Sequence, residues 1–357
     1  MVMPTALLHR PGAQRGAQRG AQAAPAPRAW TAASLARDGF DASFALPEAV
    51  NAELADALAH ARANGLTLET VEQEDIRLPS LAPHVAALRA RLDAPPGIVV
   101  LRGVALAGLD DDAAGMVAWG LANYLGRPIR QGLARDRKLF TVTNIGAANR
   151  DPTRIGASAA ESRPHTDNAC LEARPPAYIG LMCVQDALAG GDSTVISAAS
   201  LLAAMEQEDP GLAAELFAPY HFLPPHLHTW PAGPATIVKP IFEWATDVAG
   251  QPVLHIHYAR VMVEPGMAKA GTPLSPRQRA ALDLLDAMIA RPELAWTTRL
   301  APGDFMFVDN LANLHGRKAF TDDDSTGRRR VLKRVWLWRR HAGPGDDPAL
   351  LDLAELS

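Results

Sequence analysis

Two histidines and one aspartate are the side chains of this sequence best suited to binding a metal ion together. His165 and Asp167 stand two positions apart, and His315 follows 150 residues downstream in the run His-Gly-Arg. In an extended segment, side chains two positions apart point to the same side, so His165 and Asp167 can reach one ion while Thr166 faces away. A third ligand from a distant strand would complete one face of an octahedron.

Two imidazoles and one carboxylate define a particular kind of metal site. The set leaves three coordination positions open, which suits non-haem Fe(II) and oxygen chemistry because a cosubstrate and O2 need those positions. A structural zinc site would instead be closed and rich in sulfur. A His-x-Asp tripeptide is common by chance, so the interpretation depends on the motifs around it.

The motifs around the three residues form one ordered series along the chain. It consists of Arg163-Pro-His-Thr-Asp-Asn-Ala, Arg174-Pro-Pro-Ala-Tyr, Gly190-Gly-Asp-Ser-Thr, Gly303-Asp-Phe, Asn310-x4-His-Gly-Arg and Arg329-Arg-Val-Leu-Lys-Arg. This series resembles the TauD/TfdA superfamily of Fe(II)/2-oxoglutarate dioxygenases over about residues 97–340. The approach to His165, Glu161-Ser-Arg-Pro, is most similar to the clavaminate synthase-like branch, which hydroxylates free amino acids such as arginine and asparagine.

The resemblance implies a role for each matching residue. His165, Asp167 and His315 match the facial triad that holds Fe(II), and Arg330 matches the arginine that pairs with the far carboxylate of 2-oxoglutarate. A guanidinium suits that task because it holds a carboxylate by two parallel hydrogen bonds and keeps its charge. The step from His315 to Arg330 is slightly long for the family, which leaves Arg329 as an alternative.

Further residues are expected near the cosubstrate and the substrate. Arg334 matches a second arginine, which in relatives lies near the metal-binding end of the cosubstrate or the anionic group of the substrate. Either Ser193 or Thr194 matches the hydroxyl residue that hydrogen-bonds the far carboxylate of 2-oxoglutarate. We take Asn168, Arg260 and Arg334 as candidate substrate residues.

The activity that the resemblance implies is an oxygenase reaction. Fe(II), 2-oxoglutarate and O2 would supply the oxidant, with release of succinate and CO2, and the substrate would be a small amino acid or amino-acid-derived metabolite. Because Asp167 is present, hydroxylation is favoured over halogenation, since a halogenase of this family has no carboxylate there. Desaturation, ring closure and a sulfonate substrate remain open alternatives.

Two other interpretations of the histidines compete with this one. A cupin-type metal site could use His255, His257 and Glu264, and His226 and His228 form another His-x-His pair. A metal-binding jelly-roll protein without oxygenase activity, such as a sensor, is the alternative from another functional class. The sequence contains no nucleophile elbow, phosphate-binding loop or dinucleotide-binding motif.

The sequence pattern predicts that these residues are positioned by a mainly β protein with helices. Residues 1–29 form a low-complexity tail that we expect to be disordered. Residues 30–96 form a helical N-terminal segment with helices over 46–64 and 81–92, and residues 97–357 form a dioxygenase domain with a double-stranded β-helix, or jelly-roll, core. Within that domain we expect helices at 110–125, 198–217 and 276–290, the last two in a helical insert. Strands are expected at 98–101, 139–143, 178–184, 194–197, 237–244, 253–258, 305–308 and 331–338.

The composition limits the classes of partner and the location that we expect for the chain. Its 357 residues are 48% hydrophobic with a formal net charge of −4, which gives no basic footprint for nucleic acid. No apolar run approaches the roughly 18 residues of a membrane span. The two cysteines, Cys170 and Cys183, imply no disulfide framework, and reduced thiols and Fe(II) both suit a cytoplasmic location. The oligomeric state cannot be read from the sequence.

The stretch 144–163 directly precedes His165 and lacks apolar periodicity. Loops of this length are often functional. We therefore expect a lid that excludes water from the site, with an ordinary long loop as the alternative.

Overall fold

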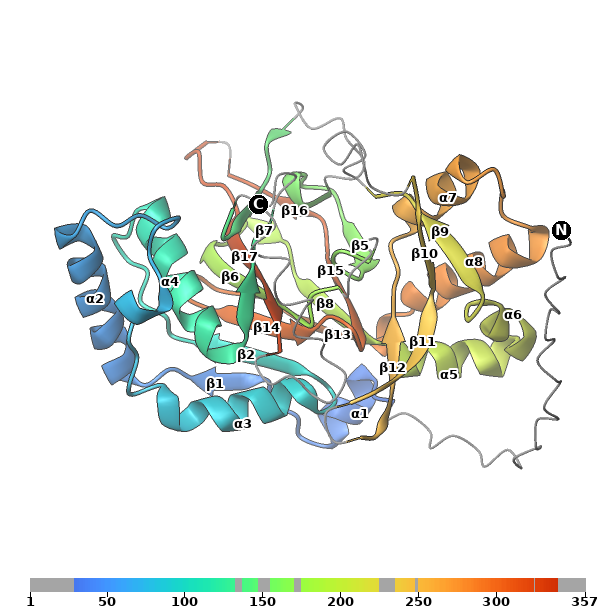
Figure 1. Cartoon of the computed structure of the whole chain (residues 1–357), viewed down its shortest axis with the longest axis horizontal. Helices are drawn as coiled ribbons and strands as arrows, with labels where there is room; N and C mark the ends of the chain where they lie inside the picture. Colours follow the sequence, from blue (N-terminus) through green and yellow to red (C-terminus); the bar gives the residue numbers. More distant parts are fainter. Residues whose placement is uncertain are drawn as a thin grey trace, which may run out of the picture.

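A computed structural model gives the arrangement of the chain for residues 29–131, 137–146, 155–169, 175–224, 235–247, 250–323 and 325–339 (Figure 1). The helices are α1 (Ala32–Arg37), α2 (Glu48–Ala63), α3 (Ala82–Asp93), α4 (Asp111–Leu125), α5 (Ala198–Glu208), α6 (Pro210–Glu215), α7 (Arg260–Lys269) and α8 (Pro276–Ile289).

The strands fall into two principal sheets and three pairs. The larger sheet contains β1 (Ser43–Ala45), β2 (Ile98–Arg102), β3 (Arg127–Ile129), β4 (Phe140–Thr143), β6 (Tyr178–Gln185), β14 (Phe305–Asp309) and β17 (Val331–Trp338). The smaller sheet contains β5 (Ser162–His165), β8 (Ser193–Ser197), β13 (Ala295–Thr298) and β15 (Asn313–Arg317). The pairs are β7 (Ala189–Gly190) with β16 (Phe320–Thr321), β9 (Pro219–Phe222) with β10 (Ile237–Pro240), and β11 (Phe242–Thr246) with β12 (Pro252–Ile256).

Sequence-distant strands alternate within both principal sheets. In the larger sheet β6 lies between β14 and β17, and in the smaller sheet β15 lies between β8 and β5. The insert that carries α5 to α8 therefore separates the two halves of the chain in sequence but not in space. This interleaving confirms the expected mainly β fold with a jelly-roll core, built as two facing sheets.

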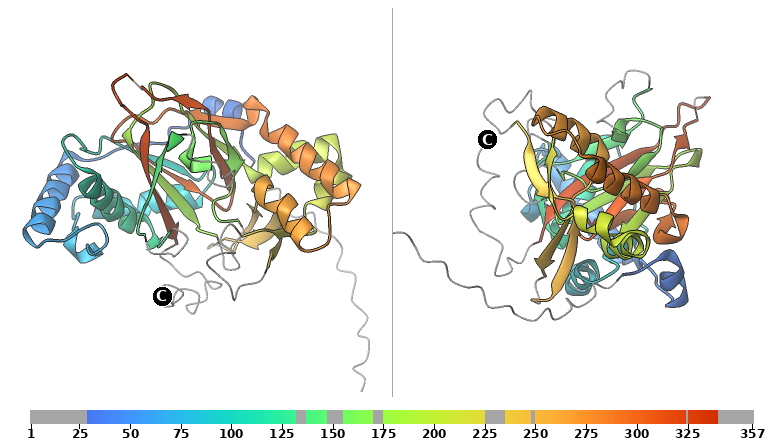
Figure 2. Two further views of the ribbon diagram at one scale, coloured as in Figure 1. Left: turned by 90° about the horizontal axis from the view of Figure 1, so that it is seen from above. Right: turned by 90° about the vertical axis from the view of Figure 1, so that its right-hand side faces the viewer.

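Helices cover the outer face of each sheet (Figures 1 and 2). An apolar layer fills the space between the sheets. Helices α2, α3 and α4 pack on the outer face of the larger sheet, where Leu54, Leu88 and Leu121 belong to one core. Helices α5, α6 and α8 share a second core with Ile196 and Leu314 of the smaller sheet. The layer between the sheets contains Val195, Ile179, Cys183, Met306, Val308 and Leu332.

Local sequence signals account for several element boundaries. Helix α8 begins after Ser275, whose side chain accepts a hydrogen bond from the Gln278 amide, and Pro276 occupies its first turn as predicted. Helix α4 begins after Asp110, which accepts from the Ala113 amide. All five residues of β14 are buried, as expected for a continuous apolar run covered on both faces.

The structure corrects two predicted elements and adds a helix. The helix expected over 198–217 is two helices, because the chain turns at Asp209 before Pro210, where Asp209 caps α6. The strand expected over 237–244 is two strands, β10 and β11, separated at Ile241. Helix α7 was not predicted, and it contains Pro265, a residue that disfavours a helix interior.

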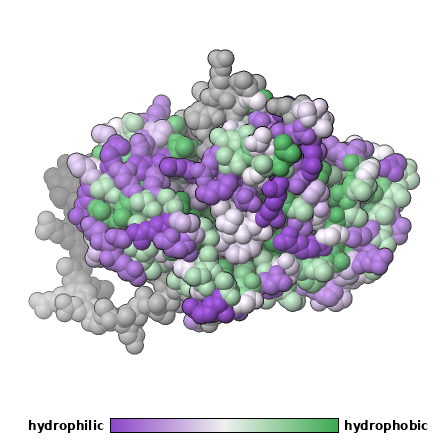
Figure 3. All heavy atoms as spheres, turned by 180° about the vertical axis from the view of Figure 1, so that it is seen from behind, coloured by the Kyte–Doolittle hydropathy of each residue, from purple (hydrophilic) through white to green (hydrophobic). Residues whose placement is uncertain are grey.

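No helix among the described residues is both long and apolar enough to cross a bilayer. On the face opposite to that of Figure 1, hydrophilic and hydrophobic residues are interspersed (Figure 3).

Candidate metal centre

The three predicted ligands meet at neighbouring strands of the smaller sheet. His315 on β15 pairs directly with His165 at the end of β5, so their side chains share one face of the sheet. Asp167 follows β5 in a turn. Its Oδ1 lies 3.3 Å from His165 Nε2 and 3.8 Å from His315 Nε2, and one ligand atom of each residue lies within 4.8 Å of the others. Among the described residues this is the group of histidine and acidic side chains that could hold a metal ion.

The ring nitrogens of the histidines are arranged for coordination. His165 Nδ1 lies 2.9 Å from the Arg163 carbonyl oxygen, so Nδ1 carries the proton that it donates and Nε2 keeps its lone pair. His315 Nδ1 is buried without a hydrogen-bond partner among the described residues. Both Nε2 atoms face the Asp167 carboxylate.

Electrostatics favour the protonation states that metal binding needs. Burial lowers the pKa of His315 to about 3, with a further contribution from His165, so the imidazole stays neutral. Burial alone would raise the pKa of Asp167, but the positive charge of the Arg334 guanidinium holds that pKa well below its usual range. A divalent ion binds neutral imidazole and ionised carboxylate, so the residues present fit Fe(II).

The main chain on both sides of Asp167 is tightly held. Thr166 faces away from the site, as expected, and its Oγ1 donates to the Ile256 carbonyl at 2.8 Å. The fully buried Asn310 accepts from the Asp167 amide at 2.9 Å and donates to the Asp167 carbonyl at 3.1 Å. Asn168 follows with a positive φ of 61°, a conformation that asparagine tolerates better than most residues. Its role as a substrate residue stays a prediction.

The geometry favours Arg330 over Arg329 as the arginine for the far carboxylate of 2-oxoglutarate. Arg330 is 4% exposed, and its Nη2 donates to the Gly191 carbonyl at 3.3 Å while the Phe320 ring lies 5.4 Å from the guanidinium carbon. Burial lowers the pKa of Arg330 from its usual value. Arg329 is largely exposed at 46% of its side chain and lies 3.7 Å from Asp322. A buried guanidinium is the better partner for a buried anion.

The strand register places Ser193 and Thr194 on opposite faces of β8. Val195 pairs with His315 and belongs to the layer between the sheets, so the alternation of β8 directs Ser193 to the same interior face. Thr194 pairs with Gly316 on the opposite face. Ser193 therefore faces the interior, two residues from Gly191, which contacts Arg330.

Arg334 and Trp336 reach the centre from the facing sheet. They are two positions apart on β17 and point to the same side. Arg334 Nη1 lies 3.1 Å from Asp167 Oδ2, and Trp336 Nε1 donates to the same oxygen at 2.7 Å. The Arg334 guanidinium also donates to Gln131 Oε1 at 3.1 Å and stacks on the rings of Phe140 and Trp336.

Arg260 is engaged away from the triad. Its guanidinium pairs with Glu264 at 2.7 Å, Asp283 at 2.7 Å and Asp286 at 3.1 Å, which ties α7 to α8. These three carboxylates fill its hydrogen-bonding fork, so the geometry favours a structural role over the predicted contact with substrate.

The rival sites find no support in the part of the chain that the structure describes. Glu264 pairs with Arg260 and Arg279, and His257 Nε2 contacts Glu243 at 2.9 Å instead. His226, His228 and Cys170 lie outside the described residues, as do residues 147–154 of the predicted lid. In its described part, the carbonyls of Ser158 and Ala160 accept from the buried Arg317 guanidinium, at 2.8 and 2.7 Å.

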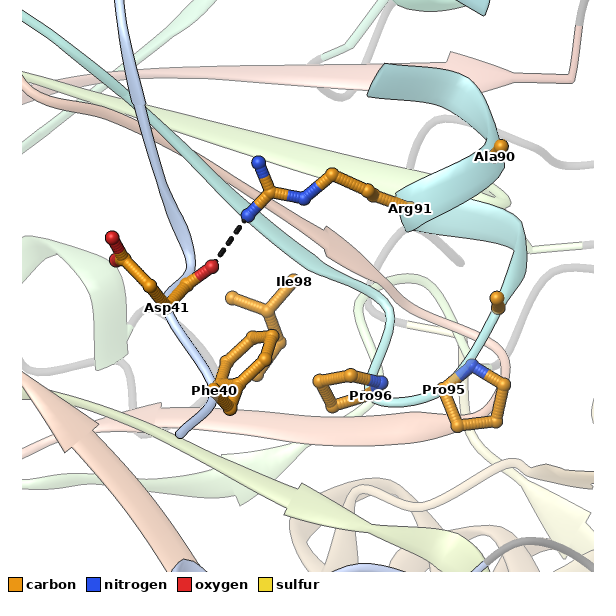
Figure 4. A pocket seen from close by; sticks show the side chains of 8 residues that line it. Phe40, Asp41, Ala90, Arg91, Pro95, Pro96 and Ile98 are labelled. Carbon is orange, nitrogen blue, oxygen red and sulfur yellow. Dashed lines mark hydrogen bonds between the residues drawn. The ribbon is translucent and has the colours of Figure 1, made fainter. Parts of the chain in front are cut away.

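A pocket elsewhere on the protein contains none of the triad. Within it Arg91 Nη2 donates to the Asp41 carbonyl at 2.6 Å, which ties α3 to the segment before β1 (Figure 4). The pocket is lined by Phe40, Asp41, Ala90, Arg91, Ala94, Pro95, Pro96 and Ile98.

Two residues of the centre escaped prediction from sequence, Trp336 and Asn310. The alternation of β17 was a usable signal for Trp336, because a residue two positions after Arg334 must share its face. Asn310 gave no comparable signal, since its contacts with Asp167 depend on the turn between β14 and β15.

Comparison with known proteins places the chain in a family. The model of the family described as taurine catabolism dioxygenase TauD, TfdA family matches residues 62–336. A relative from Streptomyces rubellomurinus (strain ATCC 31215), FR-33289 synthase, is 28% identical over 302 residues, which cover 83% of this chain and 84% of the relative.

Solved structures with the same fold come from amino-acid oxygenases. Asparagine oxygenase in complex with Fe(II), 2S,3S-3-hydroxyasparagine and succinate aligns with a TM-score of 0.66 at 20% identity, covering 84% of this chain and 94% of that one. The non-heme iron oxygenase OrfP in complex with Fe, succinate and (3S)-hydroxy-L-Arg aligns with a TM-score of 0.55 at 18% identity, covering 83% and 93%. OrfP has also been solved with Fe and alpha-ketoglutaric acid.

The chain belongs to the TauD, TfdA family of dioxygenases. This membership confirms the prediction of an enzyme of the iron- and 2-oxoglutarate-dependent class, and the described residues contain the His-Asp-His group that the class requires.

Proposed function

We propose that this protein hydroxylates an unactivated C–H bond of a small amino acid or amino-acid-derived metabolite, with release of succinate and CO2. The observation that carries the proposal is the convergence of His165, Asp167 and His315 from β5, its following turn and β15. The products bound to asparagine oxygenase and OrfP, a hydroxyasparagine and a hydroxyarginine, support an amino-acid substrate.

In this proposal the triad holds Fe(II), and the iron, 2-oxoglutarate and O2 together supply the oxidant. The chain supplies position and charge. His165 and His315 present neutral Nε2 atoms, and Asp167 presents Oδ1 as an ionised oxygen. Three ligands on one face leave the opposite face open for the cosubstrate and O2.

Arg330 and Ser193 are proposed to bind the far carboxylate of 2-oxoglutarate. Arg330 is a buried cation, and its hydrogen bond to Gly191 leaves most of its fork for an anion. A buried charge without an anionic partner is costly, so a dicarboxylate that reaches this depth would be stabilised. Ser193 lies on the interior face of β8 and would add a hydroxyl donor to the same carboxylate.

Arg334 is proposed to bind the anionic group of the substrate or the metal-binding end of 2-oxoglutarate. Its side chain is 20% exposed, in contrast to the buried Arg330, and it contacts Asp167 directly. Stacking between Phe140 and Trp336 fixes the plane of the guanidinium, so its hydrogen-bonding edge is oriented before a ligand arrives.

The test is a succinate assay on the purified protein with Fe(II), 2-oxoglutarate and a panel of the common L-amino acids, followed by mass spectrometry of the amino acid. We expect stimulated succinate formation with at least one amino acid and a product heavier by one oxygen. His165→Ala should abolish both. A product lighter by two hydrogens would replace hydroxylation by desaturation or ring closure, and stimulation only by a sulfonate would overturn the amino-acid assignment.

A further inference from the structure

The two oxygens of the Asp167 carboxylate have different surroundings. Oδ1 faces the two imidazoles, at 3.3 Å from His165 Nε2 and 3.8 Å from His315 Nε2. Oδ2 faces the larger sheet, where it accepts a hydrogen bond of 2.7 Å from Trp336 Nε1. Arg334 Nη1 spans both oxygens, at 3.1 Å from Oδ2 and 3.3 Å from Oδ1. Trp336 therefore binds the oxygen that is turned away from the imidazoles, whereas Arg334 contacts both oxygens.

Trp336 is firmly placed for this contact. It lies on β17, which is hydrogen-bonded on both sides, and it pairs with Ile179 of β6 on one side and with Ile129 of β3 on the other. Its ring packs against the apolar layer between the sheets, and the Arg334 guanidinium lies 4.7 Å from the ring centre. The indole thus reaches Asp167 from a rigid strand and not from a loop.

We propose that Trp336 is a positioning residue of the metal centre: its indole N–H holds Asp167 Oδ2 so that Oδ1 alone is presented to the ion. This inference rests on the proposed metal centre but on no particular substrate. Donors that bind a metal-ligating carboxylate orient it. If Oδ2 were free to turn toward the ion, a bidentate carboxylate could occupy one of the positions that the cosubstrate and O2 need.

Trp336 and Arg334 are not equivalent in this role. The indole N–H can only donate and carries no charge, so it orients Asp167 without neutralising it. Arg334 is a partly exposed cation that also suits an anionic ligand, and its contact with Asp167 can be shared or given up when such a ligand binds. Trp336 then keeps the orientation of the carboxylate constant between the ligand-free and ligand-bound enzyme.

The experiment measures Co(II) binding to the metal-free full-length protein by calorimetry, because Co(II) resists oxidation and the readout does not depend on turnover. Trp336→Phe keeps an aromatic ring and removes the N–H. Loss of such an outer partner typically weakens metal binding about 10- to 100-fold, and we expect that range here. Trp244→Phe, on β11 with 41% of the residue exposed, is the matched control and should bind Co(II) as the wild type does.

Equal Co(II) affinity in Trp336→Phe and wild type would overturn the proposal. The melting temperature of the metal-free variant shows whether a loss of affinity reflects a loss of fold. Absence of Co(II) binding in the wild type would overturn the metal centre itself, whereas normal binding with no turnover on any amino acid would affect only the proposed function.

A second measurement needs no variant at Trp336. The chain has seven tryptophans, so a proton–nitrogen correlation spectrum of the wild-type protein contains up to seven indole N–H signals. Binding of Zn(II), a diamagnetic probe, should shift one indole signal far more than the others, and Asp167→Ala should move the same signal in the metal-free protein. If no indole signal shifts on addition of Zn(II) or in Asp167→Ala, the contact between Trp336 and Asp167 is contradicted.

Discussion

Charge and burial hold the three ligands in the protonation states that cation binding requires. The imidazole of His315 is kept neutral by burial, and Asp167 stays ionised because the Arg334 guanidinium lies beside it. A histidine pair beside a buried carboxylate would be a poor packing arrangement in a protein without a metal, because three polar groups lose water for few hydrogen bonds. Arg330 is likewise a polar group that is buried with few hydrogen bonds, so it is suited to binding an anion.

Ser193 and Thr194 provide a matched pair for testing the cosubstrate site. Ser193→Ala should raise the 2-oxoglutarate concentration at half-maximal rate about tenfold or more, since a hydrogen bond to a charged group contributes about 1.5–3 kcal/mol. Thr194→Val, on the opposite face of β8, should change it little. Steady-state succinate assays measure both values, and the reverse ranking would move the hydroxyl role to Thr194.

The thiol of Cys183 gives a pH-dependent prediction. Burial raises the pKa of Cys183 to about 12, although the nearby Arg330 opposes the shift, so the thiolate is scarce at pH 8. Because this folded-state pKa lies above the unfolded value, the associated stability is present below pH 9 and is lost as pH rises toward 12.

In a Cys170→Ser background, iodoacetamide should therefore alkylate the native protein far more slowly than the urea-unfolded protein at pH 8. The rate should rise with pH up to about 12. Equal alkylation rates in the native and unfolded protein at pH 8 would contradict the buried thiol.

Strand register is what turns separate residues into a site. His315 pairs with His165 on one side and with Val195 on the other, so a shift of one residue in β15 would turn His315 to the opposite face. Gly316 lets the strands approach, because a Cβ there would lie 2.7 Å from the Ser162 carbonyl oxygen and 2.9 Å from Pro164 N of β5.

Gly316→Ala should therefore push β15 away from β5. We expect a loss of about 1–3 kcal/mol in the free energy of unfolding from overpacking, together with weaker Co(II) binding. Gly156→Ala is the control, because the nearest atom to its new Cβ is Val142 Cγ1 at 3.8 Å. Urea unfolding and calorimetry measure the two effects, and unchanged metal affinity in Gly316→Ala would show that the register is not set at this position.

The sequence predicted the ligands better than the layer around them. His165 and Asp167 follow the two-residue period of an extended segment, and β-branched or aromatic runs marked β2, β6, β14 and β17. Strand β15, read Asn-Leu-His-Gly-Arg, has no β-branched residue and was missed. The contacts of Asn310 and Trp336 with Asp167 join segments far apart in the chain, so only the folded arrangement reveals them.

At the scale of the whole molecule, the N-terminal helices are part of the same packed unit as the sheets. Strand β1 pairs with β2, and Val50, Leu54, Leu88 and Leu92 belong to one core with α4 and the larger sheet. The division at residues 96 and 97 stays a prediction, and side chains from both sides of it pack in this one core.

A variant that begins at residue 97 should be insoluble or should unfold without a cooperative transition, because its larger sheet would expose the apolar surface that α2 and α3 cover. A variant that begins at residue 29 keeps every described element and should melt as the full chain does. Circular dichroism melts compare the two, and a cooperative melt from the shorter variant would establish residues 97–357 as an independent domain.

The most direct test of the central claim is an anaerobic titration of the metal-free protein with Fe(II) and 2-oxoglutarate, followed by visible absorption. The account predicts a weak charge-transfer band, typical of a keto acid bound to Fe(II) by two atoms, that requires both additions. It should be absent in His165→Ala and should need far more 2-oxoglutarate in Arg330→Ala. A wild-type protein that binds Fe(II) and 2-oxoglutarate without forming the band, or forms none under any condition, would contradict the assignment of this centre as the site of an iron- and 2-oxoglutarate-dependent reaction.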